Sequence, residues 1–234
     1  MLSELAGVER VVVEIRALSV PRKWGSPVTR AGFFDLPTAR GEFVKAMGAL
    51  LRNEAGQPEG IYVTLNPLQP DLLARANNNL KDVFGRKTIS AADADVLARH
   101  HLLIDVDPVR LAGVCATGTE KAAAKLVFDG VREDMQSLRF ADPVFVIDSG
   151  NGFHGWYPID LPRDDGKKVE RLIKWLAKRH ATAAANVDTS VFNPARIARM
   201  PGSWNRKGDS VPDRPHRLVT ILETSPGAAS PFPT

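Results

Sequence analysis

Apolar and polar residues alternate with two different periods along the chain, and these periods predict interleaved strands and helices. Thr117 and Glu120 have the spacing of a helix-capping box, which marks the clearest helix start. Runs of Val, Ile and Leu that stop at Pro, Asn or Gly predict strands at residues 10–16, 60–65, 102–106, 143–147, 153–159 and 217–222. Apolar residues at helical spacing predict helices at residues 36–52, 71–83, 90–99, 117–136 and 169–176.

The order of these elements predicts the fold class. It reads β-α-β-α-α and then β-α-β-β-α-β, and the second part matches a split β-α-β, ferredoxin-like unit. We therefore expect an α+β fold in a single domain, residues 1–222, with sub-lobes at about 1–100 and 101–222. Residues 223–234 are rich in Pro, Ser and Ala, which is typical of a linker, so we expect them to lead into a further region.

Composition narrows the class of protein. An apolar fraction of 44% and a charged fraction of 25% are ordinary for a globular protein of 234 residues. The single cysteine, Cys115, excludes an internal disulfide framework and a cysteine-based zinc site. The sequence contains no apolar run of membrane-spanning length and no signal-peptide pattern, so we expect a cytoplasmic protein without a membrane partner.

Charge is distributed unevenly along the chain. Residues 163–217 hold 13 Lys and Arg against six Asp and Glu, whereas residues 1–162 hold 18 against 20. A basic segment that follows a group of acids suits a polyanionic substrate. The alternative is a solvated helix face with spare lysines.

The acids that carry candidate chemistry begin with Asp105 and Asp107, which lie two residues apart on an apolar strand. Both carboxylates therefore point to one face, where they repel each other unless a cation lies between them. This pattern suits ligands of Mg²⁺ or Mn²⁺, and the alternative is that they cap loops or pair with Arg110. Asp188 comes 81 residues after Asp107 and is a third candidate ligand or, alternatively, a loop acid or helix cap.

A glycine-containing turn and a basic loop complete the candidate site. Ser149-Gly150-Asn151-Gly152-Phe153-His154 suits the binding of a phosphate, although the alternative is a plain β-hairpin turn. Arg196, Arg199, Arg206 and Lys207 flank a Pro/Gly turn, which suits a loop that grips a triphosphate or a template backbone. Trp204 in that loop could stack on a base, and Tyr62 and Asn66 could face the sugar of a nucleotide.

Taken together, these segments resemble the archaeo-eukaryotic primase superfamily, and within it the primase-polymerases of phages and plasmids. The resemblance rests on Asp105-Val106-Asp107 as the D-x-D motif, on Ser149–His154 as the S-G-x-G-x-H motif and on Val187-Asp188 as the third motif. Residues 193–208 resemble the R-x-x-x-P-G-[ST]-x-N-x-K-G segment that often follows. The resemblance covers roughly residues 60–222, and it implies mixed and antiparallel sheets, with a ferredoxin-like catalytic half and an N-terminal α/β half.

The resemblance also implies an activity, partners and residue roles. The activity is template-directed nucleotidyl transfer, as a DNA primase or DNA polymerase in phage or plasmid replication. The implied partners are single-stranded template and primer, NTP or dNTP, and a fused or separate helicase. Asp105, Asp107 and Asp188 would bind two catalytic Mg²⁺ or Mn²⁺ ions, and Tyr62 is a candidate for sugar selection. The nucleotide would be bound by Ser149, Gly150, Asn151, Gly152, His154, Arg196, Arg199, Asn205 and Lys207.

Two alternatives from other classes remain open at this point. Asp105–Val109 fits the D-x-D-x-[TV] start of a haloacid dehalogenase-type phosphatase, with Asp164 and Asp165 as the late acidic pair. The glycine turn has no role in such an enzyme, and about 100 residues precede the motif. The second alternative is a replication initiator domain that binds DNA without polymerising it. A nicking relaxase is disfavoured because His100 and His101 are adjacent and would face opposite sides of a strand.

Overall fold

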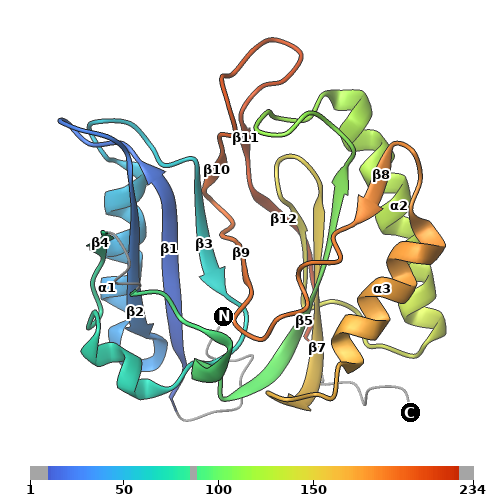
Figure 1. Cartoon of the computed structure of the whole chain (residues 1–234), viewed down its shortest axis with the longest axis horizontal. Coiled ribbons are helices and arrows are strands. Elements are labelled where there is room, and N and C mark those ends of the chain that lie inside the picture. Colours follow the sequence, from blue (N-terminus) through green and yellow to red (C-terminus); the bar gives the residue numbers. More distant parts are fainter. Residues whose placement is uncertain (1–9, 85–88, 227–234) are drawn as a thin grey trace.

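The computed structural model describes residues 10–84 and 89–226, and within them two five-stranded sheets lie between outer helices (Figure 1). Helix α1 (Leu36–Leu51) covers the outer face of the first sheet. This sheet is antiparallel throughout. Its strands, in spatial order, are β4 (Lys81–Val83), β2 (Val28–Asp35), β1 (Val12–Val20), β3 (Gly60–Thr64) and β9 (Ile197–Arg199).

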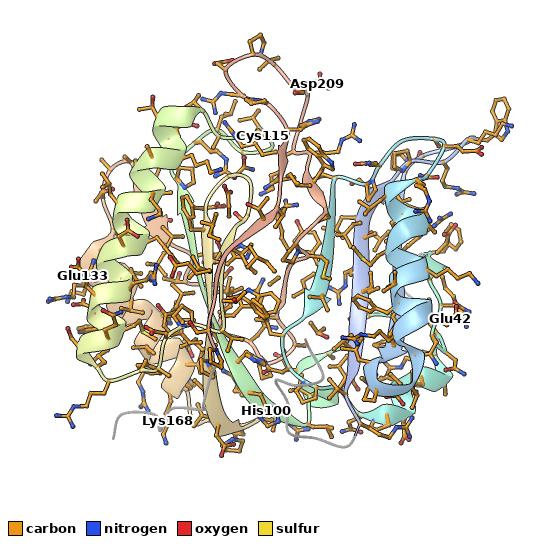
Figure 2. The ribbon with its side chains drawn as sticks, turned by 180° about the vertical axis from the view of Figure 1, so that it is seen from behind. Glu42, His100, Cys115, Glu133, Lys168 and Asp209 are labelled. Carbon is orange, nitrogen blue, oxygen red and sulfur yellow. The ribbon has the colours of Figure 1, made fainter. Side chains whose placement is uncertain are left out.

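The second sheet is also antiparallel, and α2 (Gly118–Ser137) and α3 (Lys168–His180) cover its outer face (Figure 1). Figure 2 shows Glu42 on α1 and Glu133 on α2 pointing away from the sheets on opposite sides of the molecule. The strands, in spatial order, are β12 (Thr220–Thr224), β6 (Phe145–Asp148), β7 (Phe153–Pro162), β5 (Ala98–Pro108) and β8 (Ala185–Val187).

The second sheet confirms the predicted α+β class and the ferredoxin-like order. The chain runs β5-α2-β6-β7-α3-β8, and the strands pair in the order β8-β5-β7-β6, as a split β-α-β unit requires. The prediction chose the wrong final strand, however. The fourth strand of the unit is the short β8, whereas the predicted strand at 217–222 is divided between β11 (Arg217–Leu218) and β12. Strand β11 pairs with β10 (Trp204–Asn205), and β12 is added to the edge of the sheet beside β6.

Two predicted helices are wrong, because tertiary contacts override local pattern there. Residues 71–83 form a 3-10 turn at Pro70–Ala74 and then strand β4, since Asn78 takes a left-handed conformation with φ 51° and its Oδ1 accepts a bond from the Asp35 N–H at 3.0 Å. Residues 90–99 form only a 3-10 turn at Asp93–Asp95, after which the chain enters β5.

Other local predictions are confirmed. Thr117 caps α2: its Oγ1 accepts from the Glu120 N–H at 3.1 Å, while a Glu120 carboxylate oxygen accepts from the Thr117 N–H at 2.9 Å. A cap of this kind contributes about 1 kcal/mol. In α3 the periodic apolar residues Val169, Ile173 and Leu176 are buried against the sheet. The predicted linker at 223–234 begins within β12, and residues 227–234 lie outside the described residues.

The core is continuous between the two sheets, because buried apolar residues of both belong to one cluster. Strand β5 supplies Leu102, Leu103, Ile104 and Val106 to this cluster. Burial on both sides fixes the register of β5, since a shift by one residue would bring Asp105 and Asp107 to the opposite face. Within the described parts of the chain, no helix is long and apolar enough to cross a membrane.

Candidate active site

A cavity of about 320 Å³ lies between the two sheets near the end of β5. Its wall contains all the residues to which the resemblance assigns a role except Gly150 and Gly152, whereas Asn66, Trp204 and Arg206, which the sequence also suggested, do not line it. The predicted residues that line the cavity come from both sheets and from the segments that connect them. They are Tyr62, Asp105, Asp107, Ser149, Asn151, His154, Asp188, Arg196, Arg199, Asn205 and Lys207.

Strand pairing brings the acids together. Asp105 lies directly opposite His154 of β7, and on its other side Val106 pairs with Val187 of β8. The Asp188 N–H continues this ladder by donating to the Asp105 carbonyl at 2.8 Å. Asp107 lies two residues further along β5 and therefore on the same face as Asp105. The register of three strands thus places two acids and one histidine in a row, with a third acid beside them.

A bound cation would stabilise the charged form of Asp105, which its surroundings disfavour. Its Oδ1 is buried and accepts no hydrogen bond, and the His154 Nε2 lies 3.4 Å from it. Burial raises the pKa of Asp105 well above its ordinary value, and the Asp107 and Asp188 carboxylates raise it further. Lys207 and Arg199 oppose the shift. Like charges held opposite one another destabilise a sheet unless something compensates them.

The residues present fit a divalent cation that takes part of its coordination from a substrate. Among the described residues, no three His, Cys, Asp or Glu side chains form a ready metal-binding group. Magnesium commonly uses only one or two protein carboxylates and completes its octahedron with water and phosphate oxygens. The unpaired buried oxygen of Asp105 and the repulsion from its neighbours are consistent with such a site.

Arg110 also lines the cavity, although the sequence suggested it only as an alternative partner for the acids. Its Nη2 lies 3.5 Å from Asp107 Oδ2. Its other nitrogens donate to the Val114 and Pro108 carbonyls, each at 3.1 Å. The guanidinium is therefore held by backbone and leaves Asp107 only weakly paired. The sequence indicated this contact only through the position of Arg110, three residues after Asp107.

The glycine turn does not offer the N–H groups of Gly150 and Gly152 to a phosphate, because both are hydrogen-bonded within the turn. The Gly150 N–H donates to Asp148 Oδ1 at 2.8 Å, and the Gly152 N–H donates to Ser149 Oγ at 3.1 Å. A Cβ on Gly152 would lie 2.0 Å from the Val106 carbonyl oxygen and 2.6 Å from Asp107 Oδ1. Only glycine lets the turn approach β5 this closely, so Gly152 shapes the surroundings of Asp107.

Three polar side chains around the turn present groups without partners. Asn151 Oδ1 accepts from the Ala116 N–H at 2.8 Å, which leaves its buried Nδ2 unpaired. Asn205 Nδ2 donates to the Ser149 carbonyl at 2.8 Å, which leaves its Oδ1 unpaired. Burial, with a contribution from the Arg199 charge, lowers the pKa of His154 to about 4, so its ring is neutral at pH 7. The His154 Nδ1 has no partner either.

A buried arginine faces the acids from the other sheet. Arg199 of β9 pairs with Tyr62 of β3, and its guanidinium carbon lies 4.9 Å from the centroid of the Tyr62 ring. The side chain is buried, with the residue 5% exposed, and neither Nη1 nor Nη2 has a hydrogen-bond partner. Because a buried unpaired charge is costly, this arrangement is typical of a site that receives an anion.

The segment 189–195 crosses between the sheets and connects Asp188 to Arg196. Asn66 holds it: its Nδ2 donates to the Pro194 carbonyl at 3.0 Å, and its Oδ1 accepts from the N–H groups of His100 and His101 at 2.8 and 3.0 Å. The expectation that Asn66 faces a sugar is therefore wrong, since its amide is engaged by backbone.

Asp93 and Arg99 also hold this segment, and they line a separate cavity. Asp93 Oδ1 accepts from Asn193 Nδ2 at 2.9 Å and from the Ala195 N–H at 3.0 Å. Arg99 donates to the Phe192 carbonyl and pairs with Asp165 at 3.0 Å. The sequence gave no indication of these anchors, because each is a lone polar residue whose partners lie at least 66 positions away.

Two groups account for much of the basic excess of residues 163–217. Arg196, Arg199 and Lys207 line the cavity. On α3, Lys174 pairs with Glu170 and Arg179 pairs with Asp134, which is the arrangement of a solvated helix face. Both readings of the charge pattern therefore apply, each to a different part of the segment.

No protein-family model matches this sequence, and neither does any curated protein. Several solved structures are similar, and two of them are described here. One is the AEP domain of the cyanophage S-2L primase-polymerase, with a TM-score of 0.45 and 15% identity over 94% of this chain and 85% of that one. The other is the polymerase domain of Mycobacterium tuberculosis Ligase D in complex with DNA, with a TM-score of 0.45 and 16% identity over 93% of this chain and 76% of that one.

Proposed function

We propose that this protein is a template-directed nucleotidyltransferase of the primase-polymerase kind. One observation carries the proposal. A single cavity holds three carboxylates with an uncompensated buried oxygen on one side and a buried guanidinium without a partner on the other. Groups of opposite charge that lack protein partners suit a metal–triphosphate, whose cation satisfies the acids and whose phosphates satisfy the arginine.

The roles follow from this placement. Asp105, Asp107 and Asp188 would hold Mg²⁺ or Mn²⁺, which when bound supplies activation of a primer hydroxyl and neutralisation of the leaving pyrophosphate. Arg199 and Lys207 would bind phosphate oxygens and keep the triphosphate oriented for in-line attack.

The neutral amides and the histidine would refine this orientation. Asn151 Nδ2 is a donor without a partner in the cavity wall, and Ser149 retains a hydroxyl proton to donate. His154 is neutral, so only one of its ring nitrogens carries a proton for a phosphate oxygen. Arg196 and Asn205 line the same wall and would contact the nucleotide, and Tyr62 beneath Arg199 would contact its sugar.

The wider context follows the sequence resemblance. Single-stranded template and primer would enter the cavity, and NTP or dNTP would be the substrate. We propose residues 1–222 as the catalytic domain, a helicase as a partner, phage or plasmid replication as the process and the cytoplasm as the location.

The phosphatase alternative is not supported by the placement of the acids. Asp164 and Asp165 line a different cavity from Asp105 and Asp107, so they cannot serve the same reaction centre. An initiator domain that only binds DNA is also disfavoured. Three carboxylates in a binding cavity would repel a phosphate backbone unless a cation were bound with it.

The test is extension of a labelled primer on a single-stranded template, with Mg²⁺ or Mn²⁺ and either nucleotide set. We expect extension only with a metal, its loss in Asp107→Asn and wild-type rates in Asp129→Asn. Asp129 is the control because it forms an ion pair with Lys125 on α2 and does not line the cavity. The proposal fails if the wild type extends no primer under any of these conditions, or if Asp107→Asn retains wild-type activity.

A further inference from the structure

The connection between β1 and β2 exposes an unusual group of side chains. Residues 21–27 carry Arg22, Lys23 and Trp24 and contain no acidic residue. Trp24 is 80% exposed, and Phe84, 61% exposed, lies beside this hairpin with the Arg22 guanidinium carbon 5.8 Å from its ring centroid. Large aromatic residues are rarely left so exposed, and those that are often mark an interaction surface.

This hairpin tip, defined as residues 21–27, is connected directly to the candidate active site. Leu18 of β1 lines the cavity, and the same strand leads into the tip. Arg22 follows Leu18 by only four residues, so the tip begins within about 14 Å of the cavity wall even if the chain between them were fully extended. Figure 1 shows the hairpin projecting at the upper end of the first sheet, the end toward which β5 runs in the second.

The base of the tip is held in place. Asn53 Nδ2 donates to the Pro21 carbonyl at 2.9 Å and to the Gly56 carbonyl at 2.8 Å. Below it, β1 and β2 pair from Val20 opposite Val28 to Val12 opposite Asp35. The exposed aromatic and cationic side chains therefore project from an anchored hairpin.

We propose that the hairpin tip binds single-stranded nucleic acid that extends from the cavity, with Trp24 stacked on an unpaired base and Arg22 and Lys23 against its phosphates. Stacking on an exposed ring needs an unpaired base, and two cations without a neighbouring acid in the segment complement the backbone charge. This inference rests on the proposed function, because the cavity must receive the end of the same strand.

The test is binding of a fluorescent oligothymidylate, long enough to span the cavity and the hairpin, measured by anisotropy. Trp24→Ala should weaken binding about 5- to 150-fold, the range that alanine substitution of a stacking aromatic gives. Trp24→Phe should retain most of the affinity. The control is Trp175→Ala on α3, because Trp175 is also exposed, at 42%, with the Arg179 guanidinium carbon 5.6 Å from its ring centroid.

A second measurement tests the cations separately. The double substitution Arg22→Gln and Lys23→Gln should reduce the slope of log affinity against log salt by about 1.4, since each single-strand phosphate contact contributes about 0.7. Exposed tip residues can be replaced without loss of folding, which equal melting temperatures would verify.

The outcomes separate this inference from the proposed function. If Trp24→Ala binds the oligonucleotide as tightly as the wild type while wild-type primer extension is normal, the inference fails alone, as it would if the tip served a protein partner. If binding depends on Trp24 but no extension occurs with any metal or nucleotide, the proposed polymerase activity is wrong. The inference that the hairpin tip binds single-stranded nucleic acid is then still supported.

Discussion

Substitution of Gly152 by alanine tests whether the glycine turn shapes the site by close packing. The backbone of Gly152 lies outside the left-handed region, so alanine introduces no conformational strain. Its Cβ would nevertheless lie 2.0 Å from the Val106 carbonyl oxygen and 2.6 Å from Asp107 Oδ1. Contacts this short with backbone cannot be relieved by rotation of a side chain, so either the turn or β5 must move.

The magnitude follows from overpacking and from displacement of the carboxylate. Forcing one carbon into a filled site costs about 1–3 kcal/mol of stability, or roughly 2–12 °C in melting temperature for a chain of this size. A displacement of about 1 Å at a reacting group costs about 100-fold in rate. We therefore expect Gly152→Ala to lose about two orders of magnitude in primer extension while remaining folded at 20 °C.

Two glycines serve as matched controls, because neither has a positive φ. At Gly118, the first residue of α2, a Cβ would meet nothing within 4 Å, so alanine should leave stability and extension unchanged or slightly improved. At Gly32 in β2, a Cβ would lie 1.8 Å from the Asn79 carbonyl oxygen, which creates a comparable clash outside the cavity. Gly32→Ala should lose stability to a similar degree but keep most of its extension rate.

The assay compares initial extension rates with melting temperatures for all three variants. If Gly152→Ala extends primers at the wild-type rate, or if Gly32→Ala loses as much activity as Gly152→Ala, the turn does not position Asp107.

Three further substitutions test individual contacts. Arg199→Met should weaken triphosphate binding by about tenfold or more, because it removes a buried guanidinium whose Nη1 and Nη2 have no hydrogen-bond partner in the protein; calorimetry that shows unchanged affinity would contradict this. Asn66→Ala should cost about 3–6 kcal/mol in urea unfolding, because two N–H groups and the Pro194 carbonyl lose their partner, whereas a cost below 1 kcal/mol would show that this anchor is unimportant. Burial lowers the pKa of His101 to about 4, so the unfolded chain takes up a proton first as pH falls and stability is lost between pH 6.5 and 4. His101→Asn, which can still donate to the Leu65 carbonyl that His101 Nδ1 contacts at 3.0 Å, should reduce the loss between pH 7 and 4.5 by about 2 kcal/mol; equal pH profiles would refute the assignment.

The sequence predicted elements best where a strong periodic pattern coincided with local capping. The capping box at Thr117 and the apolar stripe of α3 are examples, since both depend on residues within a few positions of each other. Strand β8 has only three residues, Ala-Asn-Val, and no pattern that separates it from a loop. It is a strand because β5 offers it an edge beside Val106.

The two wrongly predicted helices also show that a local pattern does not reveal long-range strand pairing. Residues 71–83 contain enough apolar residues to suggest a helix, but β4 pairs with β2 and Asn78 supplies a sharp turn. The pairing partner lies about 50 positions earlier in the chain, which no local window detects.

The candidate site was predictable in part, because Asp105 and Asp107 lie near the end of β5, and the glycine turn and Asp188 directly follow β6 and β8. Asp105 and Asp107 could be placed on one face from strand geometry alone. The position of Asp188 beside them depends on β8, which was not predicted, so only the resemblance connected it to the pair. The anchors Asn66 and Asp93 were missed because their roles depend on backbone groups far along the chain.

The most direct test of the central claim is the binding of Mn²⁺, followed by electron paramagnetic resonance in the presence of a nucleotide triphosphate. We expect bound Mn²⁺ in the wild type, its loss in Asp105→Asn and Asp107→Asn, and unchanged binding in the surface control Asp129→Asn. Equal Mn²⁺ binding by the wild type and both cavity variants would contradict this expectation, because the acids of β5 would then not hold the ion.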